Sequence, residues 1–453
     1  MGILLLLFVI AEIVLLVITF REQKEKEQWL KNRVLTRVSE IVIFLAALLL
    51  PQVAWDFRFK LCFFLLIIRV ATAAISYFVK KEKVQGDKSK VGAVMNALGG
   101  AVLLACSLVP ALFFTGYEGL ETSGEYEVGM TSAILIDENR VESFETDGSK
   151  REVPVYFYYP QTEGAKESGF PLVIFSHGAF GYYQSNTSTY MELASQGYVV
   201  ISLDHPYHSF FTTDTEGKTI TINPNFLQEV MYINEDTAPE EEIFALSSEW
   251  LTIRTADMNF VLDTVKRTKE AAECAEEWFV DSEETKSEIL EILAMTDMEK
   301  IGLMGHSLGG AASVTVGRQR EDIDAVIDLD GTMLGEQLKF ENGCYQYYEE
   351  AYPIPLMAID NEEHYIQGDM LDSQYVNKVV LENAIDATHT YFVGSGHMNF
   401  TDLPLFSPVL ASLLGTGTID ETECVIIMND IVLQYFDYYL KNKGDLNIKE
   451  CYQ

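Results

Sequence analysis

The residues best suited to chemistry in this sequence form the pentapeptide Gly305-His306-Ser307-Leu308-Gly309, a G-x-S-x-G pattern. An apolar run precedes it and a helix-forming run follows it, so a strand, a sharp turn and a helix are expected in that order. Such a turn, a nucleophile elbow, exposes the serine hydroxyl above the sheet. Its glycines are needed because side chains at their positions would collide with the neighbouring backbone. We therefore predict that Ser307 is a nucleophile.

A serine of this kind needs a histidine as general base, and the histidine needs an acid to orient it. In chains with this elbow the order is serine, acid, histidine, and the histidine lies on a loop after the final strand. Three histidines follow Ser307, and only His397 has this placement. His389 precedes the last predicted strand and His364 lies in a polar loop, so we interpret both as surface residues.

Two aspartates are candidates for the acid. Asp330 follows a strand expected at 325–329, and Asp360 follows a strand expected at 355–359. Both positions can reach a histidine at the end of the next strands. Asp328 lies within its strand and points to the opposite side from its neighbours, so it ranks third. Spacing alone leaves Asp330 and Asp360 as nearly equal candidates.

The oxyanion hole should consist of two backbone N–H groups. One belongs to the residue after the nucleophile, Leu308. The other belongs to the loop after an earlier strand, where Ala179 follows Ser176-His177-Gly178. We interpret His177 as a structural histidine that braces this loop.

A metal site is considered and set aside. Asp204, His205 and His208 have a spacing that resembles metal ligands, but they share one loop and no second ligand set accompanies them. We therefore expect no metal, no organic cofactor and no nucleic-acid partner.

The surrounding elements predict the fold that positions these residues. An apolar strand at 170–176, a short helix at 191–196 and a strand at 198–203 form a strand–helix–strand unit. Continuous apolar strands are typical of a parallel sheet that is covered on both faces. We predict an α/β-hydrolase fold with a mainly parallel, doubly wound sheet over residues 117–453. Polar, acidic sequence at about 209–250 is interpreted as an excursion over the rim of the site.

The first part of the chain has a different composition. Four apolar runs, each near the length of a membrane-crossing helix, lie at about 3–20, 38–55, 59–79 and 92–115. Four such runs exclude a simple signal peptide. Residues 1–116 are therefore predicted to form a bundle of about four transmembrane helices.

Charge predicts the orientation of this bundle. Residues 1–116 carry 14 Lys and Arg against 8 Asp and Glu, a net charge of +6, whereas the remainder carries a net charge of −42. Positive charge in short loops marks the cytoplasmic side, and the basic loops at 21–37 and 80–90 each follow an odd-numbered helix. Four spans then place the C-terminal domain on the extracytoplasmic face.

Two glutamates, Glu12 and Glu40, lie inside or beside apolar runs. An ionisable group in such a place is costly and often functional. One interpretation is that the two glutamates face each other inside the bundle, protonated or hydrogen-bonded. The interpretation that we favour places Glu40 at the membrane interface and Glu12 against neighbouring helices. We assign the bundle no activity beyond anchoring.

Four motifs, in order and at similar spacing, resemble those of the platelet-activating-factor acetylhydrolase family: Phe175-Ser176-His177-Gly178, Gly305-His306-Ser307-Leu308-Gly309-Gly310, Leu329-Asp330, and Gly396-His397-Met398-Asn399-Phe400-Thr401-Asp402. The resemblance runs from about Gly124 to the C-terminal helix. It implies that Asp330 is the acid and that Asp360 belongs to a structural or rim segment. The four predicted spans and the 209–250 rim depart from the family pattern.

The resulting hypothesis is a membrane-anchored serine carboxylester hydrolase that acts on small esters or on phospholipids with short or oxidised acyl chains. Two hypotheses compete with it: an acyltransferase or peptidase with the same acyl-enzyme, and a non-catalytic membrane sensor or scaffold. The second is disfavoured, because a scaffold has no need to retain serine, acid, histidine and oxyanion loop together. Five aromatic residues near the site are expected either to line an acyl pocket or to pack under the rim: Phe180, Tyr182, Tyr183, Phe210 and Phe211.

Overall fold

The computed structural model describes residues 2–21, 26–50, 53–80, 89–162, 169–234, 238–371 and 374–453. They divide into two compact units. The first comprises Met1–Glu118 with Leu405–Leu410, and the second comprises Gly119–Pro404 with Ala411–Gln453.

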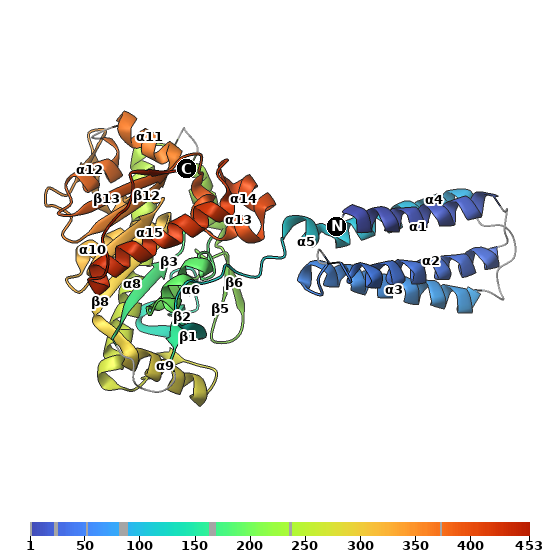
Figure 1. Ribbon diagram of the computed structural model, residues 1–453, viewed down its shortest axis with the longest axis horizontal. Helices are drawn as coiled ribbons and strands as arrows, with labels where there is room; N and C mark the ends of the chain where they lie inside the picture. The colour runs from blue at the N-terminus through green and yellow to red at the C-terminus, as the bar shows by residue number, and fades with distance from the viewer. Residues whose placement is uncertain are drawn as a thin grey trace. The chain divides into compact units, whose positions relative to one another are not determined.

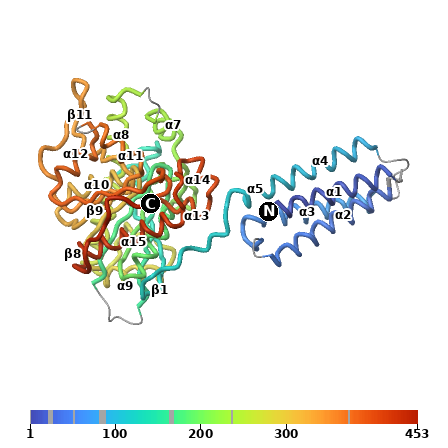
Figure 2. The backbone as a smooth tube through the Cα atoms, turned by 45° about the horizontal axis from the view of Figure 1, so that its top comes forward, coloured from blue at the N-terminus to red at the C-terminus, as the bar shows by residue number. Residues whose placement is uncertain are grey.

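The first unit is helical. Its helices are α1 (Gly2–Arg21), α2 (Lys26–Ala47), α3 (Phe57–Lys80), α4 (Lys90–Ser107) and α5 (Val109–Phe113). Helices α1 and α4 lie side by side, as do α2 and α3 (Figures 1 and 2). By length and composition, α1, α3 and α4 are able to cross a membrane, which gives three candidate spans among the described residues where four were expected.

The second expected span, 38–55, accounts for the difference. Helix α2 begins much earlier, at Lys26, and ends at Ala47. Even the least polar stretch of α2 that is long enough to cross a bilayer, residues 30–47, contains four charged residues, namely Lys31, Arg33, Arg37 and Glu40. By composition, helix α2 is therefore too polar to count as a candidate span. Its residues up to Arg37 are helical, although the sequence analysis placed them in a basic loop. Most of the other basic loop, 81–88 within 80–90, lies outside the described residues, as do 22–25 and 51–52.

A cluster of four charged side chains, Glu12, Arg37, Glu40 and Arg69, lies inside this helical unit. The side chain of Glu40 is fully buried among the helices. One guanidinium nitrogen of Arg37 lies 2.6 Å from carboxylate oxygens of both Glu12 and Glu40. Arg69 pairs with the same two glutamates and donates a hydrogen bond of 3.1 Å to the carbonyl of Gly100. The cluster thus joins all four long helices.

The second unit is built on one ten-stranded sheet with the order β14-β13-β12-β9-β8-β3-β4-β2-β1-β7. The strands are β1 (Glu127–Val141), β2 (Lys150–Gln161), β3 (Phe170–Ser176), β4 (Val199–Leu203), β7 (Trp278–Phe279), β8 (Thr296–His306), β9 (Ala325–Leu329), β12 (Leu356–Asn361), β13 (Ala387–Phe392) and β14 (Cys451–Tyr452). From β4 to β14 all neighbours are parallel, whereas β2, β1 and β7 form an antiparallel edge. The expected mainly parallel α/β sheet is confirmed.

Helices cover both faces of this sheet. The long ones are α6 (Thr187–Ser195), α8 (Glu240–Ala271), α9 (Glu283–Met295), α10 (Leu308–Gln319), α11 (Glu362–Leu371) and α15 (Glu421–Lys441). Helices α6 and α15 pack together in front of the sheet in Figure 1, and α8 packs with α10 on the other face. Every residue of β3, β4 and β9 is buried, as their apolar runs predict.

The register of the central strands aligns their carboxyl ends. Ser176 at the end of β3 pairs with Gly305 of β8, and His306 pairs with Leu329 at the end of β9. The residues that follow these three strands therefore emerge at the same edge of the sheet, which is where parallel α/β sheets bind ligands.

The segment at 209–250 has more structure than expected. It contains a hairpin, β5 (Phe211–Thr213) and β6 (Thr219–Thr221), then α7 (Pro224–Ile233) and the first turns of α8; residues 235–237 lie outside the described residues. Residues 270–299 comprise the end of α8, the strand β7, helix α9 and the start of β8. The remaining elements are a hairpin, β10 (Gln337–Glu341) and β11 (Cys344–Tyr347), helices α12 (Val376–Glu382), α13 (Leu403–Phe406) and α14 (Pro408–Leu414), and the 3-10 turns Leu334–Glu336 and His397–Phe400.

Candidate active site

Ser307 occupies a sharp turn between β8 and α10. Its backbone has φ 55° and ψ −124°, a strained conformation for a residue with a side chain. A Cβ atom on Gly305 would lie 2.3 Å from the backbone of Gly309, and one on Gly309 would lie 1.9 Å from the carbonyl oxygen of Ser176. Glycine is therefore required at both positions, and the local geometry is that of a nucleophile elbow.

Asp330 and His397 come together at the same edge of the sheet. Asp330 directly follows β9 and also has a positive φ, 53°. His397 opens the 3-10 turn that follows β13, and its Nδ1 atom lies 2.6 Å from Oδ2 of Asp330. The backbone N–H of Ser307 donates to the carbonyl of Leu329 at 2.9 Å, which holds the serine beside the residue that precedes Asp330. The structure thus gathers the three expected site residues.

The carboxylate of Asp330 accepts four hydrogen bonds. Asn361 donates its backbone N–H to Oδ1 and its side-chain amide to Oδ2, both at 2.7 Å. Nδ1 of His364 bonds Oδ1 at 2.9 Å, and His397 bonds Oδ2. Burial alone would raise the pKa of Asp330, but the hydrogen bonds from His364 and His397 outweigh it and hold that pKa well below its usual range. Asp330 is therefore a fixed negative charge.

The other two aspartates do not reach His397. Oδ2 of Asp360 lies 2.8 Å from Nε2 of His389, so this alternative acid faces a different histidine. Asp328 is fully buried, and neither of its carboxylate oxygens has a hydrogen-bond partner among the described residues. Burial raises the pKa of both Asp360 and Asp328.

The loop after β3 lies against the serine. A Cβ atom on Gly178 would lie 3.2 Å from Cβ of Ser307, so the loop approaches closely only because glycine stands there. The next residue is Ala179. Among the described residues, neither the N–H of Ala179 nor that of Leu308 donates to a protein acceptor. Both groups thus suit the oxyanion role expected of them.

Arg254, which the sequence analysis did not single out, braces this loop from α8. It is fully buried and donates to the carbonyl of His177 at 2.5 Å and to that of Gly178 at 3.3 Å. Because the C=O and N–H of a trans peptide point in opposite directions, a Gly178 carbonyl turned toward Arg254 turns the Ala179 N–H away from it. Burial lowers the pKa of Arg254 to about 9.

The residues with metal-like spacing have separate partners. His205 bonds Asp257 through Nδ1 and Ser176 through Nε2, each at 2.9 Å. Asp204 accepts from the backbone N–H of Tyr183 at 2.7 Å. These side chains therefore belong to the polar network under the loop.

Of the described residues, Asp330, His364 and His397 are a group whose ligand atoms lie within 4.8 Å of one another, which is close enough to hold a metal ion. The Nδ1 atoms of His397 and His364 lie 2.6 and 2.9 Å from the carboxylate oxygens of Asp330, and since an ionised carboxylate only accepts, each contact is a hydrogen bond when the Nδ1 atom carries a proton. The arrangement accordingly suits proton transfer.

Aromatic side chains surround the oxyanion loop. The ring of Phe211 lies 5.4 Å from that of Tyr182 and 5.8 Å from that of Phe210. Phe210 is 58% exposed and Phe211 is 42% exposed, and the backbone N–H of Phe210 donates to the carbonyl of Gly181 at 2.7 Å. An exposed apolar surface therefore lies beside the loop that contains Ala179.

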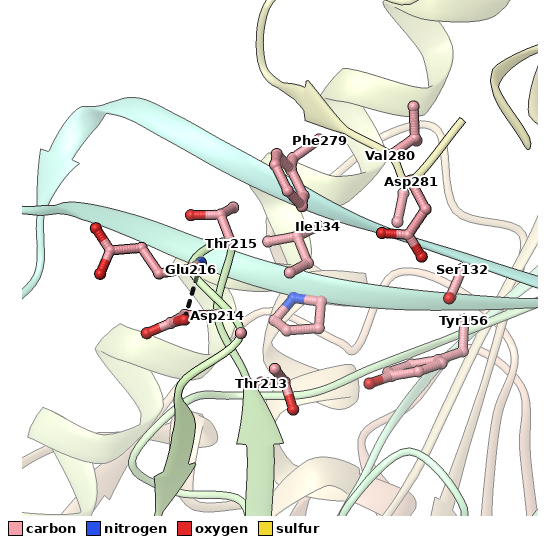
Figure 3. Close-up of a pocket in the computed structure, with 13 residues that line it drawn as sticks. Ser132, Ile134, Tyr156, Thr213, Asp214, Thr215, Glu216, Phe279, Val280 and Asp281 are labelled. Carbon is pink, nitrogen blue, oxygen red and sulfur yellow. Dashed lines mark hydrogen bonds between the residues drawn. The ribbon is translucent and has the colours of Figure 1, made fainter. Parts of the chain in front are cut away.

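A separate cavity of about 460 Å³ lies among β1, β2, β7 and the β5–β6 turn (Figure 3). Its lining includes Ile134, Tyr156, Thr215, Phe279 and Asp281, and none of Ser307, Asp330 and His397. It is distinct from the candidate active site.

Comparisons with known proteins agree with this architecture. The family model described as platelet-activating factor acetylhydrolase, isoform II, matches residues 122–452. The platelet-activating factor acetylhydrolase of Gallus gallus is 23% identical over 61% of this chain and 64% of its own length, and that of Cavia porcellus is 22% identical over 64% and 61%. The chain thus spans less than two thirds of these curated relatives.

Two further proteins extend the comparison. A probable 1-alkyl-2-acetylglycerophosphocholine esterase of Arthroderma benhamiae is 26% identical over 37% of this chain and 33% of its own. A solved structure, the ferulic acid esterase from Streptomyces cinnamoneus, covers 74% of this chain and 97% of its own with a TM-score of 0.53 and 19% identity. That likeness shows the fold, and with the sheet order it fits an α/β-hydrolase.

Proposed function

Because this chain belongs to the platelet-activating factor acetylhydrolase, isoform II, family, we propose that it is a serine carboxylester hydrolase that its N-terminal helices hold at a membrane. The observation that carries the proposal is the hydrogen bond of 2.6 Å between Asp330 and His397, next to a serine in a strained elbow. A serine in an ordinary turn requires neither a strained backbone nor a neighbouring pair of hydrogen-bonded aspartate and histidine.

In the proposed mechanism Asp330 fixes the tautomer of His397. With Nδ1–H donating to the carboxylate, Nε2 of the neutral ring is the base. It accepts the proton of the Ser307 hydroxyl as Oγ attacks the ester carbon, and it then passes that proton to the departing alkoxide. Water repeats the sequence on the acyl-enzyme and releases the carboxylic acid. The N–H groups of Ala179 and Leu308 bind the oxyanion in both steps.

The proposed substrates are esters of acetic and other short acids, including phospholipids with an acetyl or truncated sn-2 chain. The relatives' names support this class. The exposed Phe210 and Phe211 supply apolar surface near the oxyanion loop. The net charge of −42 after residue 116 repels an anionic bilayer over roughly 8–10 Å. Long-chain lipids that must be drawn from such a bilayer are therefore disfavoured relative to esters that leave it readily.

We also propose that α2 crosses the membrane as a fourth span, together with α1, α3 and α4. Alone, its charges oppose insertion. In the bundle, Arg37 and Glu40 face Glu12 and Arg69, so these two charges of α2 have opposite partners. With four spans, the connections from α1 to α2 and from α3 to α4, which belong to the basic segments 21–37 and 80–90, lie in the cytoplasm and the catalytic unit lies outside it.

The test of substrate class is kcat/KM for esters with acyl chains of two to sixteen carbons, measured with chelator present and with Ser307→Ala as the blank. We expect a maximum at short chains and no effect of the chelator. A maximum at long chains would refute the substrate class, and loss of activity on chelation would refute the metal-free mechanism.

A further inference from the structure

We propose that His364 is a positioning residue of the catalytic site, held on the second oxygen of Asp330, where it opposes protonation of His397 and so keeps the base functional at lower pH. This inference rests on the proposed function, because it assigns His397 the role of general base.

Geometry places His364 symmetrically to His397 on one carboxylate. Nδ1 of His364 lies 2.9 Å from Oδ1 of Asp330, and Nδ1 of His397 lies 2.6 Å from Oδ2. The two rings have their centroids 6.0 Å apart. The carboxylate of Asp330 therefore interacts with two imidazole rings, one at each oxygen.

Asn361, the last residue of β12, fixes the position of His364 and also donates hydrogen bonds to the acid, Asp330. The backbone N–H of His364 donates to Oδ1 of Asn361 at 2.9 Å, in the first turn of α11. Asn361 in turn donates twice to Asp330. One asparagine thus couples the carboxylate and the second histidine, and the side chain of His364 is only 29% exposed.

The surroundings of His364 favour its charged form. Burial alone would lower its pKa, but the hydrogen bond to Asp330 and the nearby charges of Asp330, Asp360 and Glu363 raise that pKa to about 9. His397 is the basic group that faces it across Asp330. At neutral pH His364 is therefore an imidazolium, and it becomes neutral only as the pH rises through about 9.

This charge acts on the proton-transfer step. When His397 accepts the serine proton, Asp330 lies between two cations. At about 6 Å and an effective dielectric constant near 20, such a charge shifts a protonation equilibrium by roughly one to two pH units. His364 accordingly makes protonation of His397 by solvent harder, so the acid limb of the pH profile lies at lower pH than it would without His364.

The experiment compares His364→Gln with His389→Gln in the full-length protein. Glutamine keeps a hydrogen-bond donor and removes the charge. His389 is the matched control, because it also bonds a buried aspartate, Asp360, at 2.8 Å but does not contact Asp330. The readouts are kcat/KM for p-nitrophenyl acetate from pH 5 to pH 9, the rate of labelling by a fluorophosphonate over the same range, and Tm.

We expect the acid limb of His364→Gln to move to higher pH by about one to two units, and that of His389→Gln to stay in place. An active, folded His364→Gln protein whose limb coincides with that of the wild type would overturn the inference. An equal shift in His389→Gln would overturn it as well. A wild type that neither hydrolyses the ester nor reacts with the probe would instead refute the proposed function.

A second measurement applies if His364→Gln does not fold. In the wild type, ¹⁵N resonances of the histidine rings report directly which rings carry two protons. The inference requires His364 to be doubly protonated at pH 7 and to titrate near pH 9. A neutral His364 ring at pH 7 would contradict it.

Discussion

At the scale of single residues, the proposed chemistry depends on one carboxylate, Asp330, that accepts more hydrogen bonds than the other buried aspartates of the site. Asp330 accepts from Asn361, His364 and His397, whereas Asp360 accepts from His389. Two aspartates on adjacent strand ends therefore have different tasks, although both are buried.

We expect Asp330→Asn to lower kcat by about a thousandfold or more, because the amide favours the wrong tautomer of His397. Asp360→Asn should lower kcat by less than about tenfold, since it changes only the contact with His389. Steady-state kinetics on variants with Tm values close to that of the wild type make the comparison. The reverse ranking would show that the acid is misassigned.

Strand ends and chain order predict Ser307 and His397, but they leave Asp330 and Asp360 as nearly equal candidates for the acid, and only the family resemblance selects Asp330. None of these patterns predicts His364. Its contact with Asp330 exists only because β9 and β12 are neighbours in the sheet, and a histidine in a polar stretch otherwise indicates a surface residue. Arg254 was missed for a similar reason, since one cation in a long helix is most often solvated.

At the scale of elements, helix α8 acts as a brace beneath the oxyanion loop. Arg254 reaches the carbonyls of His177 and Gly178, and the nearby Asp257 binds Arg151 and His205. The strands β3, β4 and β9 were predictable because burial on both faces favours apolar residues at most of their positions. The brace was not, because its polar groups come from loops and helices that are distant in the sequence.

Arg254→Met should lower kcat by about a hundredfold, because a small displacement of the loop misplaces the Ala179 N–H. It should also destabilise the fold by about 1–3 kcal/mol, since buried carbonyls lose their donor. The control is Arg267→Met on the same helix, where the arginine is largely exposed and bonds Glu277. Kinetics and denaturant unfolding measure both effects. Equal activity in the two variants would exclude the bracing role.

At the scale of the whole molecule, an acidic catalytic unit belongs to the same chain as a basic helical bundle. Hydropathy predicts α1, α3 and α4 well as candidate spans, because the exposed side chains of these helices are mainly apolar. It misjudged the limits of α2, whose Arg37 and Glu40 belong to the buried charged cluster with Glu12 and Arg69. A hydropathy scale scores each charged residue by itself and takes no account of ion pairs with other helices.

If α2 is a span, single cysteines at Gln23→Cys and Gln52→Cys, in a background without the native cysteines, will lie on opposite sides of the membrane. A membrane-impermeant thiol reagent added to intact cells should then label position 52 and leave position 23 until the membrane is opened. Labelling of both positions on the same side would show that α2 does not cross. Labelling of position 23 alone would show the opposite orientation.

The central claim is that Ser307 is the nucleophile of an ester hydrolase, and the direct measurement is the site of fluorophosphonate attachment. Peptide mass spectrometry of the labelled wild type should place the adduct on Ser307, with hydrolysis of p-nitrophenyl acetate lost in step with labelling. Ser307→Ala should take up no label and should retain less than about one thousandth of the wild-type kcat. An adduct on another residue, or undiminished hydrolysis by folded Ser307→Ala, would contradict the account.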